Sequence, residues 1–409
     1  MSRDTDMFER LKSVAVIISI ILVTFFVTRA TWRYFTNSQL PVIVMVGLEQ
    51  GGYYGRVLAC SAKSEGPYKV AQLSMWLDGK EFDFGASKDV GARYFELPIK
   101  IDTTNMMNGK HTLEVEAVDA SYHHNRKRDA WDFYVDNLQL SAALVAPEYR
   151  GEQGRTMHLK IQANKEIEKA TFTFLGKPYS FTPTAEGSML YECFVPVDCE
   201  ENPNEYMVTV DVQDYVKNNL KLATKIMILP YPFKKQHGFS VGNGKLDQEK
   251  EISRGARILE ETLERWAKES PRKKLWAGPF EFPIDVQKQT TPFGEIRMTA
   301  ERGRYLHKGL DLLNRPKCIV WASQHGKVII KDRFLMTGNT VVIDHGLGVF
   351  TLYAHLEDFA DIQVGDMIRK GNPVGRLGMT GYASGYHLHW EIRVNNTPVD
   401  PLEWTSKVY

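Results

Sequence analysis

Apolar positions in this chain form one continuous run near the start and then follow a period of two. Ser13 to Thr28 (SVAVIISIILVTFFVT) carries no charge and consists mainly of valine, isoleucine, leucine and phenylalanine. As a helix this run is about 24 Å long, slightly less than a hydrocarbon core of about 30 Å. Trp32, Tyr34 and Phe35 extend it with side chains typical of the membrane interface. The pattern predicts a transmembrane anchor at residues 13–35, preceded by a cytoplasmic tail at residues 1–12.

Two other interpretations of the apolar run remain open. Thr28-Arg29-Ala30 fits the cleavage site of a signal peptide, and a run of this length also occurs in buried core helices. Basic residues lie both before and after the run, so the positive-inside rule gives only a weak indication of orientation. These residues are Arg3, Arg10, Lys12, Arg29 and Arg33.

Residues 40–232 read as short alternating or apolar stretches separated by glycine, asparagine, aspartate and proline, which is typical of antiparallel β-sandwiches. An internal repeat supports two similar units, because TLEVEAVDA and MVTVDVQDY match at an offset of 95 residues, about one immunoglobulin-like domain. The matched positions are Leu113, Val115, Ala117 and Asp119 in the first copy and Val208, Val210, Val212 and Asp214 in the second. We expect one immunoglobulin-like sandwich at residues 40–138 and another at 139–232, acting as spacers or as platforms for protein partners.

A helix and a second β-rich stretch complete the predicted organisation. Apolar residues recur at steps of three and four through residues 245–270, and Pro271 ends the pattern. This stripe predicts a linker helix docked on a neighbouring domain, with a partner-binding helix as the alternative. Residues 275–409 return to period-two runs punctuated by glycine, including GKVIIKDRF, NTVVIDHG and HLHWEIRVN. The expected fold class is therefore mainly β, with a β-sandwich at the C-terminal end.

Charge and cysteine content narrow the function classes. The chain has 51 Lys plus Arg against 50 Asp plus Glu, a net charge of +1, so it lacks the basic surplus that attracts nucleic acid. No nucleic acid partner is expected. The four cysteines are too few and too scattered for a disulfide scaffold or a cysteine-based zinc site. Cys193 and Cys199 are close enough in sequence to form a bridge, and both the bridged and the free state remain open.

Candidate chemistry is concentrated in the C-terminal stretch. His307 and Asp311 occur together in LHKGLDLL, a weak signal by itself. His387 and His389 flank Leu388 in an apparent strand, whose period of two places both imidazoles on one face. His355 ends another apparent strand, TLYAHLED. Histidines that converge from strands built to bury apolar side chains indicate a metal or catalytic centre.

Imidazoles and a carboxylate together suit a catalytic Zn²⁺ site, in which three protein ligands leave the fourth tetrahedral position for water. The chain contains no His-Glu-x-x-His motif, which supplies a glutamate base in many metalloproteases. Histidines outside the ligand set are then needed to move the proton and to stabilise the oxyanion.

The stretch from Thr291 to Trp404 resembles the lysostaphin/LytM-type peptidoglycan endopeptidases. The phrases that carry this resemblance are PFGEIR, HKGLDL, ASQHGKVI, GNTVVIDHGLGVFTLYAHL, VGDMIRKGNPVGRLGMTGYASGYHLHWEI and PVDP. The resemblance implies that His307, Asp311 and His389 bind Zn²⁺, while His355 and His387 form a catalytic pair that does not bind the metal. It also implies a small β-sandwich of duplicated hairpins, here at about residues 275–409.

Other polar residues near these motifs have simpler explanations. His325 and His345 sit at glycine turns, and a structural role is expected for both. Asn339 is expected to orient a neighbouring strand and Tyr353 to pack among other side chains, rather than to contact substrate. The glycines of GMTGYASGYH are expected to form turns that position His387, with Tyr382 or Tyr386 flanking the site.

The function implied by the resemblance is a membrane-anchored zinc metalloendopeptidase that hydrolyses the peptide cross-links of bacterial peptidoglycan, with stem peptides as substrate. Because these peptides lie outside the cytoplasm, the expected location is the bacterial cytoplasmic (inner) membrane, single-pass, with the catalytic domain outside. The alternative is a catalytically silent relative that binds the wall or activates an amidase. A general peptidase for secreted proteins is the third reading.

Overall fold

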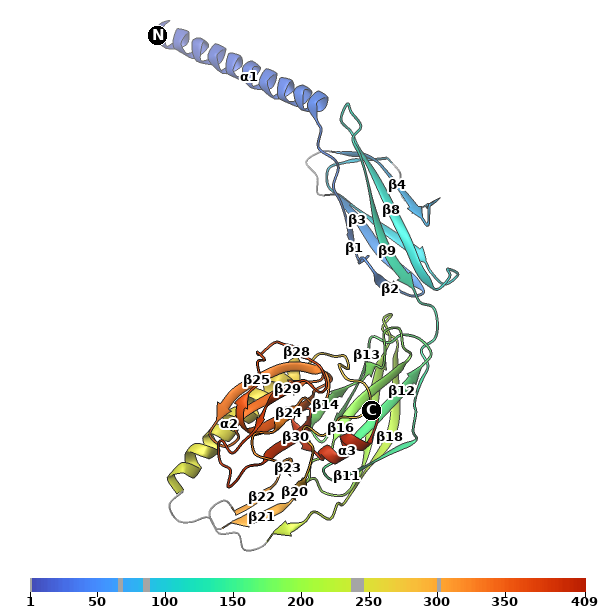
Figure 1. Ribbon diagram of the computed structural model, residues 1–409. Coiled ribbons are helices and arrows are strands. Elements are labelled where there is room, and N and C mark those ends of the chain that lie inside the picture. Colours follow the sequence, from blue (N-terminus) through green and yellow to red (C-terminus); the bar gives the residue numbers. More distant parts are fainter. Residues whose placement is uncertain (1, 65–68, 84–88, 237–245, 300–302) are drawn as a thin grey trace. The chain divides into compact units, whose positions relative to one another are not determined.

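The computed structural model describes residues 2–64, 69–83, 89–236, 246–299 and 303–409. The chain is mainly β, as expected, and it divides into two compact units, Met1–Gln139 and Leu140–Tyr409 (Figure 1). Each unit is described by itself below.

The first unit begins with a long exposed helix, α1 (Ser2–Thr36). Lys12–Thr36 is long and apolar enough to cross a membrane, and none of its apolar window is buried in the protein. This exposure contradicts the alternative of a buried core helix. Backbone and side-chain hydrogen bonds join the end of α1 to the loop after Asp119, including those from Tyr122 N to Tyr34 O (3.1 Å) and from Asn37 Nδ2 to Asp119 Oδ2 (2.7 Å).

Two sheets follow in this unit and enclose a shared apolar core. The smaller sheet has the order β1 (Ile43–Val46), β3 (Val57–Ser64) and β7 (Phe95–Asp102). The larger sheet has the order β2 (Gly52–Tyr54), β9 (Arg126–Val135), β8 (Gly109–Asp119), β4 (Val70–Leu77) and β5 (Lys80–Glu81), with β6 (Asp89–Ala92) also paired to β4.

The second unit starts with another pair of sheets around a core of its own. One sheet has the order β10 (Ala142–Leu144), β12 (Thr156–Ala163), β16 (Leu190–Pro196) and β15 (Thr182–Pro183). The other has the order β11 (Glu148–Glu152), β18 (Asn219–Leu229), β17 (Glu205–Gln213), β13 (Lys169–Phe174) and β14 (Lys177–Ser180).

The repeat seen in the sequence corresponds to equivalent strands. β8 and β17 each pair antiparallel with the following strand, and that strand pairs parallel with a short strand from the start of the domain. All eight matched residues are buried. Asp119 accepts hydrogen bonds from Ser121 and Asn125, and Asp214 accepts them from Asn218, so each aspartate organises the turn that follows its strand.

The C-terminal part of the second unit is built on one ten-stranded network. Its main order is β20 (Lys288–Thr291), β23 (Leu310–Leu313), β30 (Leu388–Val394), β27 (Val349–Phe359), β26 (Gly338–Asp344), β25 (Gly326–Phe334) and β28 (Met367–Ile368). Three further strands join this network, namely β24 (Ile319–Trp321), β29 (Pro373–Leu377) and β31 (Thr397–Val399). β27 connects the network, because it pairs with β26, β29 and β30.

A helix covers one face of this network. α2 (Leu246–Glu269) carries the apolar stripe found in the sequence, and Leu259 and Leu263 are buried against β25, β26 and β27. The partners of these leucines in the sheet are Ile329, Ile330, Val342, Phe350, Leu352 and Ala354. The described part of the stripe is therefore occupied within the chain, as expected of a docked helix.

The second sandwich packs directly against this C-terminal part. Phe194 of β16 lies in the same core cluster as Trp276 and Trp404, the latter from α3 (Pro401–Ser406). Arg155 forms an ion pair with Asp400 (2.6 Å). A small sheet of β19 (Lys235–Gln236), β21 (Ile296–Thr299) and β22 (Gly303–Leu306) also joins the two parts. The second sandwich is thus an integral part of the C-terminal unit.

The four cysteines are free thiols. Cys193 points into the core of the second sandwich, whereas Cys199 packs against the C-terminal core. The two side chains face different cores, which explains why they do not form the bridge that their spacing left open.

Candidate metal centre

Asp311 and His389 are held side by side by strand pairing. β23 pairs antiparallel with β30, and Asp311 lies directly opposite His389. Directly paired residues project their side chains from the same face of a sheet. Gly309 permits this approach, because a Cβ atom there would lie 2.4 Å from the carbonyl oxygen of Trp390. The small residue in HKGLDL thus has a steric role next to the site.

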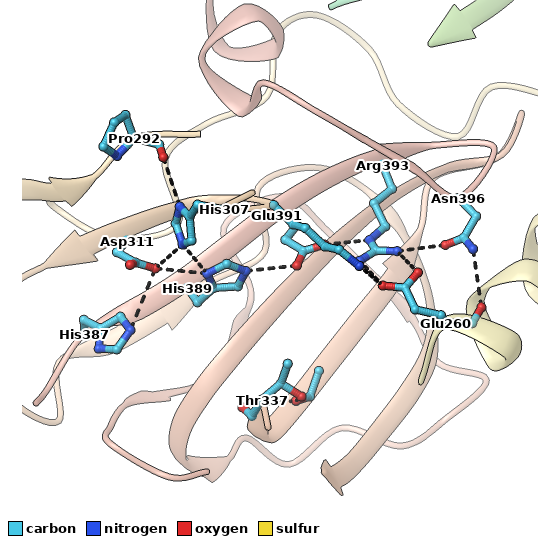
Figure 2. A network of polar contacts seen from close by, with 12 residues as sticks. Glu260, Pro292, His307, Asp311, Thr337, His387, His389, Glu391, Arg393 and Asn396 are labelled. Atoms are coloured by element: carbon cyan, nitrogen blue, oxygen red, sulfur yellow. Dashed lines mark hydrogen bonds and ion pairs between the residues drawn. The ribbon is translucent and has the colours of Figure 1, made fainter. Parts of the chain in front are cut away.

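His307 completes a group of three potential ligands (Figure 2). Its Nε2 atom lies 2.9 Å from Asp311 Oδ1 and 3.0 Å from His389 Nδ1, and His389 Nδ1 lies 2.9 Å from the same carboxylate oxygen. The three side chains come from two segments that are 78 or more residues apart. All three are buried.

The remaining ring nitrogens of both histidines face acceptors. His307 Nδ1 donates to the carbonyl oxygen of Pro292 (3.0 Å), and His389 Nε2 donates to Glu391 Oε1 (2.9 Å). A carbonyl or carboxylate oxygen can only accept, so in the neutral imidazoles these nitrogens carry the proton. The lone pairs of His307 Nε2 and His389 Nδ1 then converge with Asp311 Oδ1. A cation relieves the repulsion among three such atoms.

Electrostatics in the protein support the same description. Burial by itself raises the pKa of Asp311, but its contacts with His307 and His389 hold that pKa well below its usual range. Burial lowers the pKa of His389, yet its contacts with Asp311 and Glu391 raise it to about 9. In the metal-free protein a proton on His389 therefore compensates the carboxylates. Metal binding has to displace that proton.

His355 and His387 lie beside this group. Their ring centroids are 4.7 Å apart, and His387 Nε2 is 3.8 Å from Asp311 Oδ1. β30 begins at Leu388, so His387 precedes the strand and is held by a single bridge to Gly378. Nδ1 of His355 donates to the Thr380 carbonyl (2.8 Å) and Nδ1 of His387 donates to the Gly385 carbonyl (2.9 Å). Nε2 is thus the unprotonated nitrogen of each neutral ring.

His355 has an unusual backbone conformation. Its φ is +59°, in the left-handed region that a histidine seldom occupies. The conformation is fixed by the bond from its amide to Thr337 O (2.7 Å) and by the side-chain bond to Thr380. Burial, with the neighbouring His389 and His387, lowers the pKa of His355 to about 3, so this ring is neutral at neutral pH. Backbone strain of this kind is often concentrated at functional sites.

The other polar candidates have structural contacts. His345 is fully buried and bonds to His325 O (2.6 Å) and Thr351 Oγ1 (2.9 Å). The amide of Asn339 donates to Glu357 O (2.9 Å). The buried hydroxyl of Tyr353 accepts from the amide of Ser323 (2.8 Å).

Three residues near the centre were not identified from the sequence. Glu391 bonds to His389, Arg393 bonds to Glu391, and Glu260 of α2 bonds to Arg393 (Figure 2). Two of them could have been found from the sequence, because Glu391 and Arg393 continue the period-two spacing of His387 and His389. His389, Glu391 and Arg393 form a buried polar row on one face of β30, opposite Leu388, Trp390 and Ile392, and the partly buried His387 precedes the strand. Glu260 had no such signal.

His307, Asp311 and His389 form a group that could hold a metal ion on a mainly β scaffold. Residues 305–401 match the model of peptidase family M23, so the chain carries an M23 domain at its C-terminal end. The resemblance drawn from the sequence motifs is confirmed.

Two curated relatives each match about 30% of this chain. The DD-carboxypeptidase/endopeptidase Mpg of Neisseria meningitidis is 38% identical over 120 residues, which cover 29% of this chain and 27% of that protein. The peptidoglycan DD-endopeptidase ShyB of Vibrio cholerae is 31% identical over 125 residues, covering 30% and 29%. The catalytic domain of lysostaphin from Staphylococcus simulans aligns at 25% identity with a TM-score of 0.26, covering 29% of this chain and 92% of that domain. The matched part spans less than a third of these curated relatives.

One relative of another kind matches over a slightly longer stretch. The murein hydrolase activator EnvC of Escherichia coli is 29% identical over 155 residues, covering 34% of this chain and 37% of that protein. The relatives of this chain therefore include both named peptidases and a named activator.

Proposed function

We propose that this protein is a membrane-anchored zinc metalloendopeptidase that hydrolyses peptide cross-links of bacterial peptidoglycan. The observation that carries the proposal is the convergence of His307 Nε2, Asp311 Oδ1 and His389 Nδ1 within 3.0 Å of one another. Two imidazoles and one carboxylate are a ligand set of catalytic Zn²⁺ sites. The M23 domain and the relatives named as peptidoglycan endopeptidases support the substrate class.

The residues around the centre divide into two roles. His307, Asp311 and His389 hold the ion, and a bound zinc ion supplies a Lewis acid that polarises the scissile carbonyl. His355 and His387 each present a free Nε2 toward the site, fixed by the bond that Nδ1 donates to a carbonyl. One of these rings accepts the proton of the attacking water and delivers it to the leaving amine. The other can stabilise the oxyanion only in its protonated form, in which Nε2 becomes a hydrogen-bond donor.

The apolar helix gives the proposed location. α1 contains a segment long enough to span a membrane, and peptidoglycan lies outside the cytoplasm. We place α1 in the cytoplasmic membrane as a single-pass anchor and the M23 domain on its outer side.

A second candidate function is supported by the similarity to the activator EnvC. In this reading the M23 domain binds a separate amidase or the wall, without hydrolysing it. The geometry favours the enzyme, because the three candidate ligands lie together and the rings of His355 and His387, 4.7 Å apart, lie beside them.

Purified full-length protein with intact peptidoglycan separates the two functions. The enzyme is expected to contain one zinc ion per chain and to convert cross-linked muropeptides into uncross-linked ones without any added protein. An activator leaves the cross-links intact and releases stem peptides from glycan only when an amidase is added. Zinc-loaded protein that shows the second behaviour overturns the proposal.

A further inference from the structure

A buried polar chain extends from the candidate metal centre along one face of β30 to the helix α2. Glu391 accepts from His389 Nε2 through Oε1 (2.9 Å) and from Arg393 Nε through Oε2 (2.6 Å). Glu391 and Arg393 are 3% and 2% exposed. A buried charge needs nearly all of its hydrogen bonds satisfied, so the position of each group in this chain depends on the next.

Glu260 of α2 is the last member of this chain. Arg393 donates from Nη1 to Glu260 Oε2 (2.6 Å) and from Nη2 to Glu260 Oε1 (3.0 Å), a two-point contact that fixes the plane of the guanidinium group. Asn396 reinforces the contact, because its side chain accepts from Arg393 (2.9 Å) and donates to the Glu260 carbonyl (3.3 Å). Figure 2 shows the unbroken path from His389 through Glu391 and Arg393 to the helix.

Glu260 also contacts the segment that carries the other two ligands. Lys308, which directly follows His307, forms an ion pair with the same carboxylate. One side chain of α2 thus contacts both ligand-bearing segments, through Lys308 on one and Arg393 on the other. The neighbouring Leu259 is buried in the sheet, which holds this part of the helix in place.

We propose that Glu260 is a positioning residue for the metal centre, acting through Arg393 and Glu391 to hold the ring of His389 with Nδ1 facing the metal. This inference rests on the proposed zinc site. Groups that bond to the outer nitrogen of a metal-binding histidine fix its orientation, and their loss typically weakens metal binding by about 10- to 100-fold. The helix α2 is then part of the metal centre, in addition to covering the sheet.

The physical reason lies in how Arg393 shares its charge. With Glu260 present, the guanidinium group lies between two carboxylates, and Glu391 keeps one oxygen for His389. Replacing Glu260 with glutamine removes the outer charge, so the buried cation is attracted by Glu391 alone. Glu391 is drawn toward Arg393, and the bond that fixes His389 is weakened.

Glu261 offers a matched control on the same helix. Its side chain is 68% exposed, and its nearest recorded partner is Arg257 one turn away at 3.6 Å. Glu261→Gln removes the same charge from the next position without touching the polar chain.

The test measures zinc affinity of the full-length protein by competition with a chromogenic chelator, together with the absorption spectrum of the cobalt-substituted form. Glu260→Gln is expected to bind zinc about tenfold more weakly and to alter the cobalt spectrum, whereas Glu261→Gln changes neither. Zinc affinity within twofold of the wild type in Glu260→Gln overturns the inference, and so does an equal loss in Glu261→Gln.

The zinc affinities of the two single variants and the double variant distinguish positioning of His389 through Glu391 from a general destabilisation of α2. If Glu260 acts through Glu391, then Glu260→Gln adds little further loss to a protein that already carries Glu391→Gln. Losses that simply multiply show that the two residues act independently and overturn the inference. A wild-type protein that binds no zinc contradicts the proposed function instead, so the two failures are distinguishable.

Discussion

At the scale of single residues, the centre depends on which ring nitrogen of each histidine faces an acceptor. Pro292 O, Glu391, Thr380 O and Gly385 O take the outward nitrogens of the four histidines. The sequence motifs predicted which five side chains to examine. They did not predict these acceptors, because three of them are backbone carbonyls whose positions depend on loop conformation. They also did not predict the left-handed backbone of His355, which depends on the loop around Thr337.

The roles of His307 and His355 predict different effects of alanine substitution. His307→Ala is expected to abolish zinc binding, because it removes one of three ligands. His355→Ala is expected to retain zinc and to lose about 10²- to 10⁴-fold in turnover, the usual contribution of proton transfer. Metal analysis and cross-link hydrolysis measure the two effects.

His124→Ala, an exposed substitution in the first unit, serves as a control and should affect neither property. Equal loss of zinc in the His307 and His355 variants contradicts the roles assigned here.

At the scale of elements, periodicity predicted the strands and the helix well where one face is buried. Leu259 and Leu263 belong to the apolar stripe of α2 and are buried against the sheet. The matched residues of β8 and β17 are all buried as well. The apolar stripe predicted only the docked side of α2, and it gave no sign that Glu260 is engaged by Arg393 and Lys308. The spacing of residues along the sequence shows which of them share a helix face. It does not show which distant strand or loop those residues contact.

Docking of α2 predicts a strong effect of shortening its central leucine. Leu263 is fully buried against the sheet, so Leu263→Ala is expected to destabilise the C-terminal unit by about 2–5 kcal/mol. Ile258 is 50% exposed on the same helix, and Ile258→Ala should change stability by about 0.5 kcal/mol or less. Calorimetric unfolding of both variants gives the comparison, and similar shifts in the two would contradict the docking.

At the scale of the whole molecule, the sequence predicted the mainly β composition and the apolar helix, but not the close packing of the second sandwich with the M23 part. That interface joins residues about 245 positions apart, such as Arg155 and Asp400, through side chains that do not differ in type from ordinary surface residues. Phe194 is a second example. The alternation of β16 shows which side chains share a face, but it does not show that Phe194 packs in the C-terminal core.

The interface contains a carboxylate that makes its stability depend on pH. Glu192 is buried; burial raises its pKa, but the contacts with His158 and Lys274 outweigh this and lower it below 4.5. A lowered pKa stabilises the folded state above about pH 4.5 and the contribution is lost as pH falls through the folded pKa. The stability difference between wild type and Glu192→Gln should therefore shrink as the buffer is made more acidic than about pH 4.5.

Thermal unfolding at pH values above and below this one measures that difference. If the stability difference between the two proteins grows as the pH falls, the pKa of Glu192 is raised in the folded state, and the prediction is wrong.

The anchor gives a prediction in cells. Full-length protein should remain in the membrane fraction after an alkaline wash, and protease added to intact spheroplasts should digest the M23 domain. A variant that lacks residues 1–36 should lose its membrane association, because α1 supplies the apolar segment. Protection of the M23 domain from protease until the cells are lysed would contradict the proposed orientation.

The central claim is hydrolysis of a cross-link at the centre formed by His307, Asp311 and His389. Its most direct test is mass analysis of one defined cross-linked muropeptide dimer after incubation with the zinc-loaded protein. We predict conversion into two monomers that together have gained one water molecule, and no conversion by His307→Ala. An intact dimer after prolonged incubation with fully zinc-loaded wild-type protein would contradict the account.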